Sequence, residues 1–202
     1  MTSGPSARGP GLSATTIGVV VGLCAGLLGV VVIAAIAVPR FLSYGTLAKQ
    51  AEVKTRLKLV FAGEVSFFTK NRRYSDVVEQ IGFVPVAGSR YVYLLNAAPT
   101  LEHVVAFDPS PAPEHTGIDA DERSSARVTV EALERATPPN VWQDLGVHGN
   151  CPESCAMSAV AGANLDADAT IDVWSISTRE RVINGVTVPA GTPFNHVNDV
   201  RE

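Results

Sequence analysis

Residues 17–38 read IGVVVGLCAGLLGVVVIAAIAV, and none of these 22 side chains carries a charge. As an α-helix rising 1.5 Å per residue, the stretch would extend about 33 Å, close to the roughly 30 Å hydrocarbon core of a bilayer. A helix also satisfies its own backbone hydrogen bonds, which lipid cannot do. The sequence therefore predicts a single transmembrane helix over residues 17–38, preceded by a disordered segment over residues 1–16.

A cleaved signal peptide is the main alternative for this stretch. Signal peptides have an apolar region of about 7–15 residues, preceded by basic residues and followed by a small-x-small cleavage site. Here the apolar run is longer, Arg8 is the only basic side chain before it, and Pro39-Arg40-Phe41 follows it. The pattern favours a retained anchor.

Small residues recur along the predicted membrane helix at spacings of three and four. Residues spaced in this way let a second helix approach closely inside a membrane, although glycine is also simply common in membrane helices. We group these glycines with the proline that follows the stretch as candidate helix-packing residues: Gly18, Gly22, Gly26, Gly29 and Pro39.

The orientation of the anchor is left open by the charges. Basic residues are more numerous after the apolar stretch than before it, because residues 40–58 contain five and only Arg8 precedes the stretch. The positive-inside rule would then place the C-terminal domain in the cytoplasm. A cysteine pair in that domain indicates the opposite side.

Residues 39–70 predict an amphipathic stem helix. Apolar side chains recur at steps of three and four, and charged residues such as Lys49, Lys54 and Arg56 fill the remaining turns as a solvated face would. We expect the apolar stripe to lie against a sheet; it consists of Val53, Leu57, Val60, Phe61, Val65 and Phe68.

Residues 71–202 predict a small β-rich head. β-branched and aromatic residues indicate strands over 91–95, 103–107, 155–162 and 170–177, and 108–123 is expected to be a loop. Asn184-Gly185 within residues 182–187 indicates a β-hairpin, because this dipeptide favours the type I′ turn. Residues 127–136 fit either a strand or a helical turn. A helix followed by antiparallel strands implies an α+β domain with the helix packed on the sheet.

Cys151 and Cys155 lie close together in a polar loop, which favours a short disulfide in an exported domain. Two free thiols are the plainer alternative. A zinc site with His148 is a further alternative, although a structural site needs a fourth ligand. Cys24, inside the apolar stretch, reads as a small hydrophobic residue.

Oxygen-bearing side chains alternate with small or apolar residues near position 168. Such spacing begins the calcium loops of helix–loop–helix proteins, although Ala169 replaces the usual glycine and Ser175 the usual glutamate. A strand with acidic residues on one face gives the same spacing. The candidate calcium ligands are Asn164, Asp166, Asp168, Thr170 and Asp172.

The formal net charge of −4 gives no basis for nucleic-acid binding. We also find no glycine-rich phosphate loop, nucleophile elbow or paired metal-binding histidines. The sequence therefore predicts neither an enzyme nor a protein with a required cofactor.

Several segments of the chain together resemble the type IV pilins and pseudopilins of bacteria. They cover roughly half of the chain, and their order matters more than any single one. The segments are AAIAVPRFL at 34–42, AKQAEVKTRLK at 48–58, AGEVSFF at 62–68, NRRYS at 71–75, AVAGANLDADATIDVWSI at 159–176 and VNDV at 197–200.

The resemblance implies a long helix, half of it in the membrane, that carries a small antiparallel β-sheet head. Precursors in that family have a short basic leader ending in glycine, then an aromatic residue and a glutamate. That block is not found here, and the place of the glutamate falls at about Gly22. Gly18 matches the leader glycine by position alone.

We therefore expect a structural protein of the bacterial inner membrane that serves filament assembly, adhesion, motility or secretion. It would pass the membrane once, hold residues 71–202 in the periplasm or outside the cell, and associate with other copies or other pilin-like subunits through its N-terminal helix. The alternative is a membrane-tethered extracytoplasmic binding domain that does not polymerise.

Overall fold

The structure is a computed structural model, and it describes residues 14–84, 86–102, 114–121, 124, 127–165 and 168–199. The chain divides into two compact units, residues 1–44 and residues 45–202. Helix α1 (Ala14–Asn71) contributes residues to both units. We describe each unit by itself.

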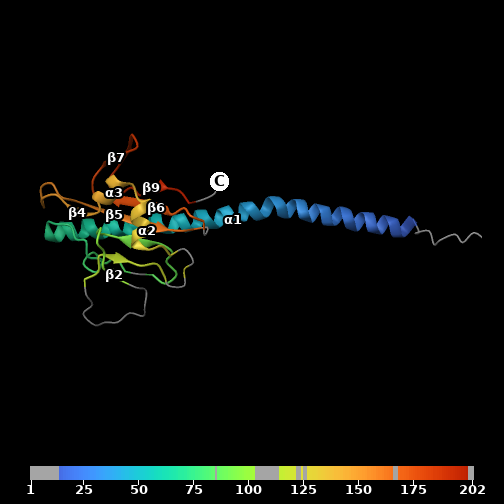
Figure 1. The fold of residues 1–202 in the computed structure, drawn as a ribbon, viewed down its shortest axis with the longest axis horizontal. Helices are drawn as coiled ribbons and strands as arrows, with labels where there is room; N and C mark the ends of the chain where they lie inside the picture. The colour runs from blue at the N-terminus through green and yellow to red at the C-terminus, as the bar shows by residue number, and fades with distance from the viewer. Residues whose placement is uncertain are drawn as a thin grey trace, which may run out of the picture. The chain divides into compact units, whose positions relative to one another are not determined.

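The first unit contains the N-terminal part of α1 (Figure 1). The large apolar side chains that the structure describes in this unit are exposed, with 64% of Leu23 and 68% of Ile33 accessible to solvent. We call this set the apolar surface: Leu23, Leu27, Leu28, Val30, Val31, Val32 and Ile33. Within the described residues, no helix combines the length and the apolar character that crossing a membrane requires. The transmembrane helix over residues 17–38 stays a prediction.

In the second unit, α1 buries a stripe of side chains at alternating steps of four and three. Val53, Leu57, Val60 and Glu64 are fully buried. The first three were predicted to belong to the apolar stripe, whereas Val65, also predicted to belong to it, is 43% exposed. The buried stripe continues at Glu64 instead, because the residue four positions after Val60 lies on the same face of an α-helix.

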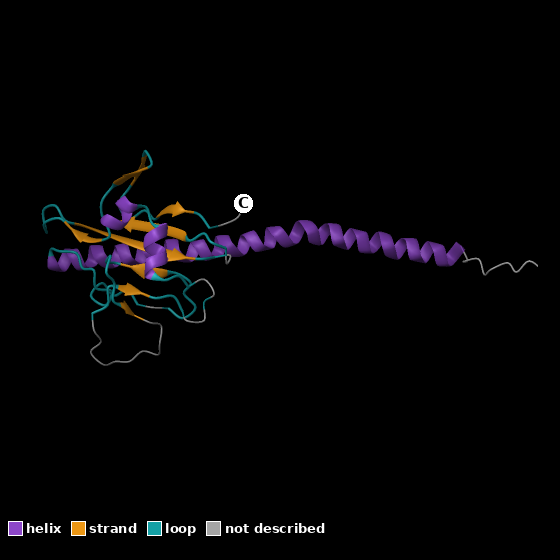
Figure 2. Ribbon diagram, in the orientation of Figure 1, coloured by secondary structure: helices purple, strands orange, loops and turns teal. Residues whose placement is uncertain are grey.

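A seven-stranded sheet forms the body of the second unit (Figure 2). Its order is β2-β3-β1-β5-β6-β9, and β4 pairs with the same strand, β5, that pairs with β1. All pairs are antiparallel except β2 with β3. The strands are β1 (Val92–Leu94), β2 (Leu101–Glu102), β3 (Gly117–Ile118), β4 (Gly146–His148), β5 (Ala156–Ala163), β6 (Asp172–Ser177) and β9 (Phe194–Val197).

Both faces of the sheet are covered, because successive side chains of a strand point to opposite faces. On one face Tyr93, Ala161 and Trp174 pack with Leu57 of α1 and its neighbours. On the other face Leu94, Val160 and Val173 pack with Leu133 and Val141 of two short helices, α2 (Val130–Ala136) and α3 (Pro139–Gln143). The second unit thus has helices and a largely antiparallel sheet, as the α+β prediction requires.

Small residues in β5 allow α2 to pack closely on the sheet. A Cβ atom added to Gly162 would lie 2.3 Å from Cδ1 of Leu133, so the Leu133 side chain of α2 would have to move to admit it. Of the segment 127–136, which the sequence left undecided, Val130–Ala136 is helical, and Thr129 caps this helix: the Ala132 N–H donates to Thr129 Oγ1 at 3.2 Å.

The local predictions for the head have mixed outcomes. The Asn184-Gly185 turn joins β7 (Arg181–Ile183) to β8 (Val186–Val188), and both turn residues have the positive φ of a type I′ turn. The loop predicted over 108–123 is wrong at β3, which pairs with β1 there. The strand predicted over 103–107 lies outside the described residues.

Candidate functional sites in the apolar surface and the head

The apolar surface is the first candidate site. Large contiguous apolar patches are uncommon on soluble monomers and mark sites that contact a membrane or another protein. Gly26 and Gly29 lie in the same segment, and an added Cβ would meet nothing within 4 Å at either residue. Both are therefore open to a partner helix. The side chains at Gly18, Gly22 and Pro39 are not described, so their helix-packing role stays a prediction.

The second site is a buried carboxylate, Asp172, at the start of β6. We call it and its donors the Asp172 hub. Five groups donate to it: Tyr91 Oη at 2.6 Å, Trp174 Nε1 at 2.6 Å, Asn195 Nδ2 at 2.8 Å, Gln50 Nε2 at 3.1 Å and the Asp199 backbone N–H at 3.4 Å.

The hub connects segments that are distant in the sequence. Gln50 comes from α1, while Tyr91 precedes β1 and Asn195 lies in β9. Burial and the adjacent Asp172 carboxylate raise the pKa of Tyr91 far above its ordinary value, so the phenol keeps its proton and donates it. Hydrogen bonds to a charged acceptor are stronger than neutral ones, so the hub fixes α1 to the sheet at this end.

Glu64 is the buried carboxyl at the other end of the α1 stripe. The Ser75 backbone N–H donates to its Oε2 at 3.2 Å, while Oε1 has no partner among the described residues. Burial raises the pKa of Glu64 to about 8; the Ser75 hydrogen bond opposes this and the nearby Asp76 adds to it. Glu64 is therefore mostly protonated at neutral pH. The sequence analysis missed it because a glutamate in a charged helix reads as a surface residue.

Two cations of α1 lie over aromatic rings of the head. Lys54 Nζ is 4.9 Å from the ring centroid of Trp174, and the guanidinium of Arg56 is 4.5 Å from that of Phe83. Lys49 Nζ donates to the Leu165 carbonyl at 2.8 Å. Lys54 is exposed, as the predicted solvated face requires, whereas Lys49 and Arg56 are partly buried because their long side chains reach back to the head.

The loop after β4 carries the cysteine pair. Cys151 and Cys155 form a disulfide, as predicted. The zinc alternative with His148 does not hold in this state, because zinc binds thiolates and neither sulfur is one. Among the residues the structure describes, no three His, Cys, Asp or Glu side chains are grouped to hold a metal ion.

The candidate calcium ligands are described in part. Asp166 lies outside the described residues. The Asn164 side chain donates to the Asp168 carbonyl at 2.6 Å, and the Thr170 N–H donates to Asp168 Oδ1 at 2.6 Å. Asp172 belongs to the hub, where both of its oxygens accept hydrogen bonds. The calcium site stays a prediction.

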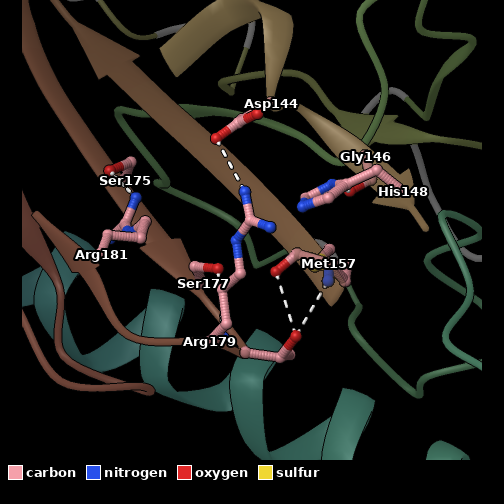
Figure 3. A network of polar contacts seen from close by, with 9 residues as sticks. Asp144, Gly146, His148, Met157, Ser175, Ser177, Arg179 and Arg181 are labelled. Carbon is pink, nitrogen blue, oxygen red and sulfur yellow. Dashed lines mark hydrogen bonds and ion pairs between the residues drawn. The ribbon is translucent and has the colours of Figure 1, made fainter. Parts of the chain in front are cut away.

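A pocket of about 330 Å³ lies between α3, β5 and β7, and we call it the β7 pocket. Figure 3 shows its two arginines: Arg179 reaches Asp144 at 3.1 Å, whereas Arg181 turns to Ser175, where Nη1 donates to the hydroxyl at 2.7 Å. The Ser175 Oγ also lies 2.6 Å from His196 Nε2. Since Arg181 only donates, the hydroxyl hydrogen of Ser175 is free to point at His196.

Electrostatics in the β7 pocket follow from burial. Burial is the main cause that lowers the pKa of Arg181 to about 10, and burial together with the Arg181 charge lowers the pKa of His196 to about 4. His196 is therefore neutral at pH 7 and accepts the Ser175 hydrogen. The pocket could not be predicted from the sequence, because its residues come from three segments that are distant along the chain.

Comparisons with known proteins agree with the resemblance seen in the sequence. The sequence model of the family described as type IV pilin PilA matches residues 44–172. The chain is 34% identical over 189 residues to the type IV major pilin protein PilA of Myxococcus xanthus (strain DK1622), and the match covers 84% of this chain and 85% of that protein.

Proposed function

The chain belongs to the type IV pilin PilA family, and from this membership we propose that it is a structural subunit that polymerises into a filament. Pilins serve filament assembly, adhesion and motility. Family membership favours this role over a tethered binding domain that does not polymerise. The role requires no catalytic residue, since the subunit acts through its contacts.

The observation that carries the proposal is the apolar surface. Seven large aliphatic side chains of one helical segment are exposed together. Water is a poor solvent for such a surface, so it requires lipid or the apolar surfaces of other helices. Copies of the chain that bundle these segments would bury them against one another.

We further propose that residues 17–38 anchor the subunit in the bacterial inner membrane before assembly, with the head in the periplasm or outside the cell. The Cys151–Cys155 disulfide supports this side of the membrane, because disulfides persist in oxidising compartments. The excess of basic residues after the apolar stretch opposes it. Mass spectrometry of the unreduced protein from its native membrane tests this placement. A mass two hydrogens below that of the reduced protein would show the disulfide and support an exported head.

The main test is a charge placed on the apolar surface. Ile33→Asp replaces a side chain that is 68% exposed by a carboxylate, and Val186→Asp is the matched control on the β7–β8 hairpin, where the side chain is 54% exposed. We expect Ile33→Asp to abolish filaments sheared from the cell surface, whereas Val186→Asp should retain them. Equal filament yields from both variants would refute the proposed assembly surface.

A second test separates assembly from membrane anchoring. Gly29→Leu keeps the segment apolar but adds bulk at a position that is open in the free subunit. We expect the variant to stay in the membrane fraction while filament yield falls several-fold, since close helix approach needs small residues. Val30→Leu, at an adjacent exposed position, is the control and should assemble normally.

A further inference from the structure

The β7 pocket contains hydrogen-bond donors that nothing in the described part of the chain uses. Arg181 Nε and Nη2 have no partner there, and neither does Ser158 Oγ. All three atoms are shielded from bulk water, and Ser158 as a residue is only 4% exposed. Buried polar groups in folded proteins are nearly always paired, so an unpaired set in one pocket indicates a missing partner.

The two free donors of Arg181 have a specific geometry. Nη1 is occupied by Ser175, which leaves the Nε–H and an Nη2–H that point in the same direction along one edge of the guanidinium. That edge is the two-donor fork that binds both oxygens of a planar oxyanion at once. Ser158, from strand β5 of the seven-stranded sheet, adds a hydroxyl to the same lining.

Charge determines the class of oxyanion. The negative charge of Asp144 is already paired with Arg179, and Glu180, also in the lining, makes no ion pair among the described residues. The Nε/Nη2 edge of the partly buried Arg181 therefore has no hydrogen-bonded carboxylate among the described residues, although the charge of Asp144 also acts on this guanidinium. Val141, Val182 and Ile183 complete the lining with apolar surface. A singly charged group on a short aliphatic body matches this combination better than a phosphate.

We propose that the β7 pocket binds a carboxylate carried on a short aliphatic chain, held by the Nε/Nη2 fork of Arg181 with Ser158 beside it. The volume of about 330 Å³ suits a ligand of this size, since it falls at the small end of ligand pockets. The carboxylate can belong to a free short-chain acid or to an acidic side chain of another protein chain. This inference does not depend on filament assembly.

The test uses the full-length chain in detergent micelles and follows the arginine Nε–H signals by NMR. The signal of Arg181 is assigned by its loss in Arg181→Lys. Two probes distinguish the sources: butyrate stands for a free acid, and N-acetylglutamate N-methylamide stands for an acidic side chain in a chain. Sodium chloride at the same ionic strength is the blank.

We expect a saturable downfield shift of the Arg181 Nε–H with at least one probe, with a dissociation constant of about 1–10 mM, and no shift with the blank. The Arg135 Nε–H, on α2 and bonded to the Glu131 carbonyl at 3.1 Å, is the internal control and should not move. A shift with butyrate alone would identify a free acid as the ligand. A shift with the glutamate derivative alone would identify an acidic side chain of another protein.

Two variants keep the test independent of folding. Arg181→Lys keeps the charge but loses the fork, and should weaken binding at least about tenfold, followed on the backbone signals of β7. Ser158→Ala removes only the hydroxyl and should weaken binding a few-fold. Any of three results would overturn the proposal. They are no saturable shift in the wild type, an equal shift with sodium chloride, and tighter binding of inorganic phosphate than of either probe.

Discussion

Asp172 and Glu64 are both completely buried carboxyl residues, one at each end of the contact between α1 and the sheet. Asp172 accepts five hydrogen bonds, whereas Glu64 accepts one and leaves Oε1 without a partner among the described residues. The first carboxyl is surrounded by donors that suit a charge. The second has too few, and burial raises its pKa to about 8.

The difference shows that burial by itself does not decide the charge of an acidic residue. A buried carboxylate is costly unless hydrogen bonds replace the water it loses. The Asp172 donors come from α1, from the residue before β1 and from β6 and β9, so the charge also specifies how these segments meet. Glu64 has too few donors to replace the lost water, so it avoids a buried charge by binding a proton.

The largest expected effect is the loss of the Asp172 carboxylate. Asp172→Ala removes the acceptor of five buried or partly buried hydrogen bonds and should lower the free energy of unfolding by about 3–5 kcal/mol. Urea denaturation of the full-length chain measures it. Asp144→Ala is the control, because its pair with Arg179 is half exposed and should be worth less than about 1 kcal/mol. Equal losses in the two variants would refute the special role of the hub.

The next largest effect is a gain in the free energy of unfolding when Glu64 is replaced, and it depends on pH. The pKa of Glu64 is about 8 in the folded chain against an ordinary value of 4.5, so the folded state holds a proton that the unfolded state has lost between these values. Stability from this group is full below about pH 4.5 and is lost as the pH rises to about 8.

Glu64→Gln keeps the shape and cannot ionise. We expect the variant to be more stable than the wild type by about 1–3 kcal/mol at pH 8, with a smaller difference at pH 5. Denaturation at several pH values measures the difference. Glu79→Gln is the control, at a carboxylate more than one third exposed. A difference for Glu64→Gln that does not change with pH would contradict a protonated Glu64.

A smaller effect isolates one donor of the hub. Tyr91→Phe removes the hydroxyl that donates to Asp172 Oδ2 and keeps the ring in the core, so we expect a loss of about 1–2 kcal/mol. The measurement is denaturation, alone and combined with Asp172→Ala. In the double variant the Tyr91→Phe loss should nearly vanish, because the hydrogen bond is already gone. Additive losses would show that the phenol acts elsewhere.

The smallest effect adjusts Glu64 through its neighbour. Asp76 adds to the raised pKa of Glu64 by repulsion, so Asp76→Asn should lower that pKa by less than about one unit. NMR titration of the Glu64 side-chain carboxyl carbon measures the shift. Burial remains the larger cause, and a pKa that falls to the ordinary value in this variant would show that repulsion dominates instead.

Features fixed by neighbouring residues were predicted well. The Asn184-Gly185 turn and the Cys151–Cys155 disulfide each depend on a few adjacent residues, and the structure has both. Val53, Leu57 and Val60 were identified by helical spacing. The same pattern failed at residue 65, because the stripe continues through Glu64 and a charged residue type hid it from a count of apolar positions.

The sequence by itself determined the apolar stretch, the family and the short-range turns, since these need only the order and spacing of residue types. The tertiary structure alone decided which buried carboxyl is surrounded by hydrogen-bond donors, which cations of α1 lie over aromatic rings, and where the Nε and Nη2 donors of Arg181 are left without a partner. Desolvation and hydrogen bonding depend on what surrounds a group in space. At Asp172 and in the β7 pocket, those surroundings come from segments distant along the chain.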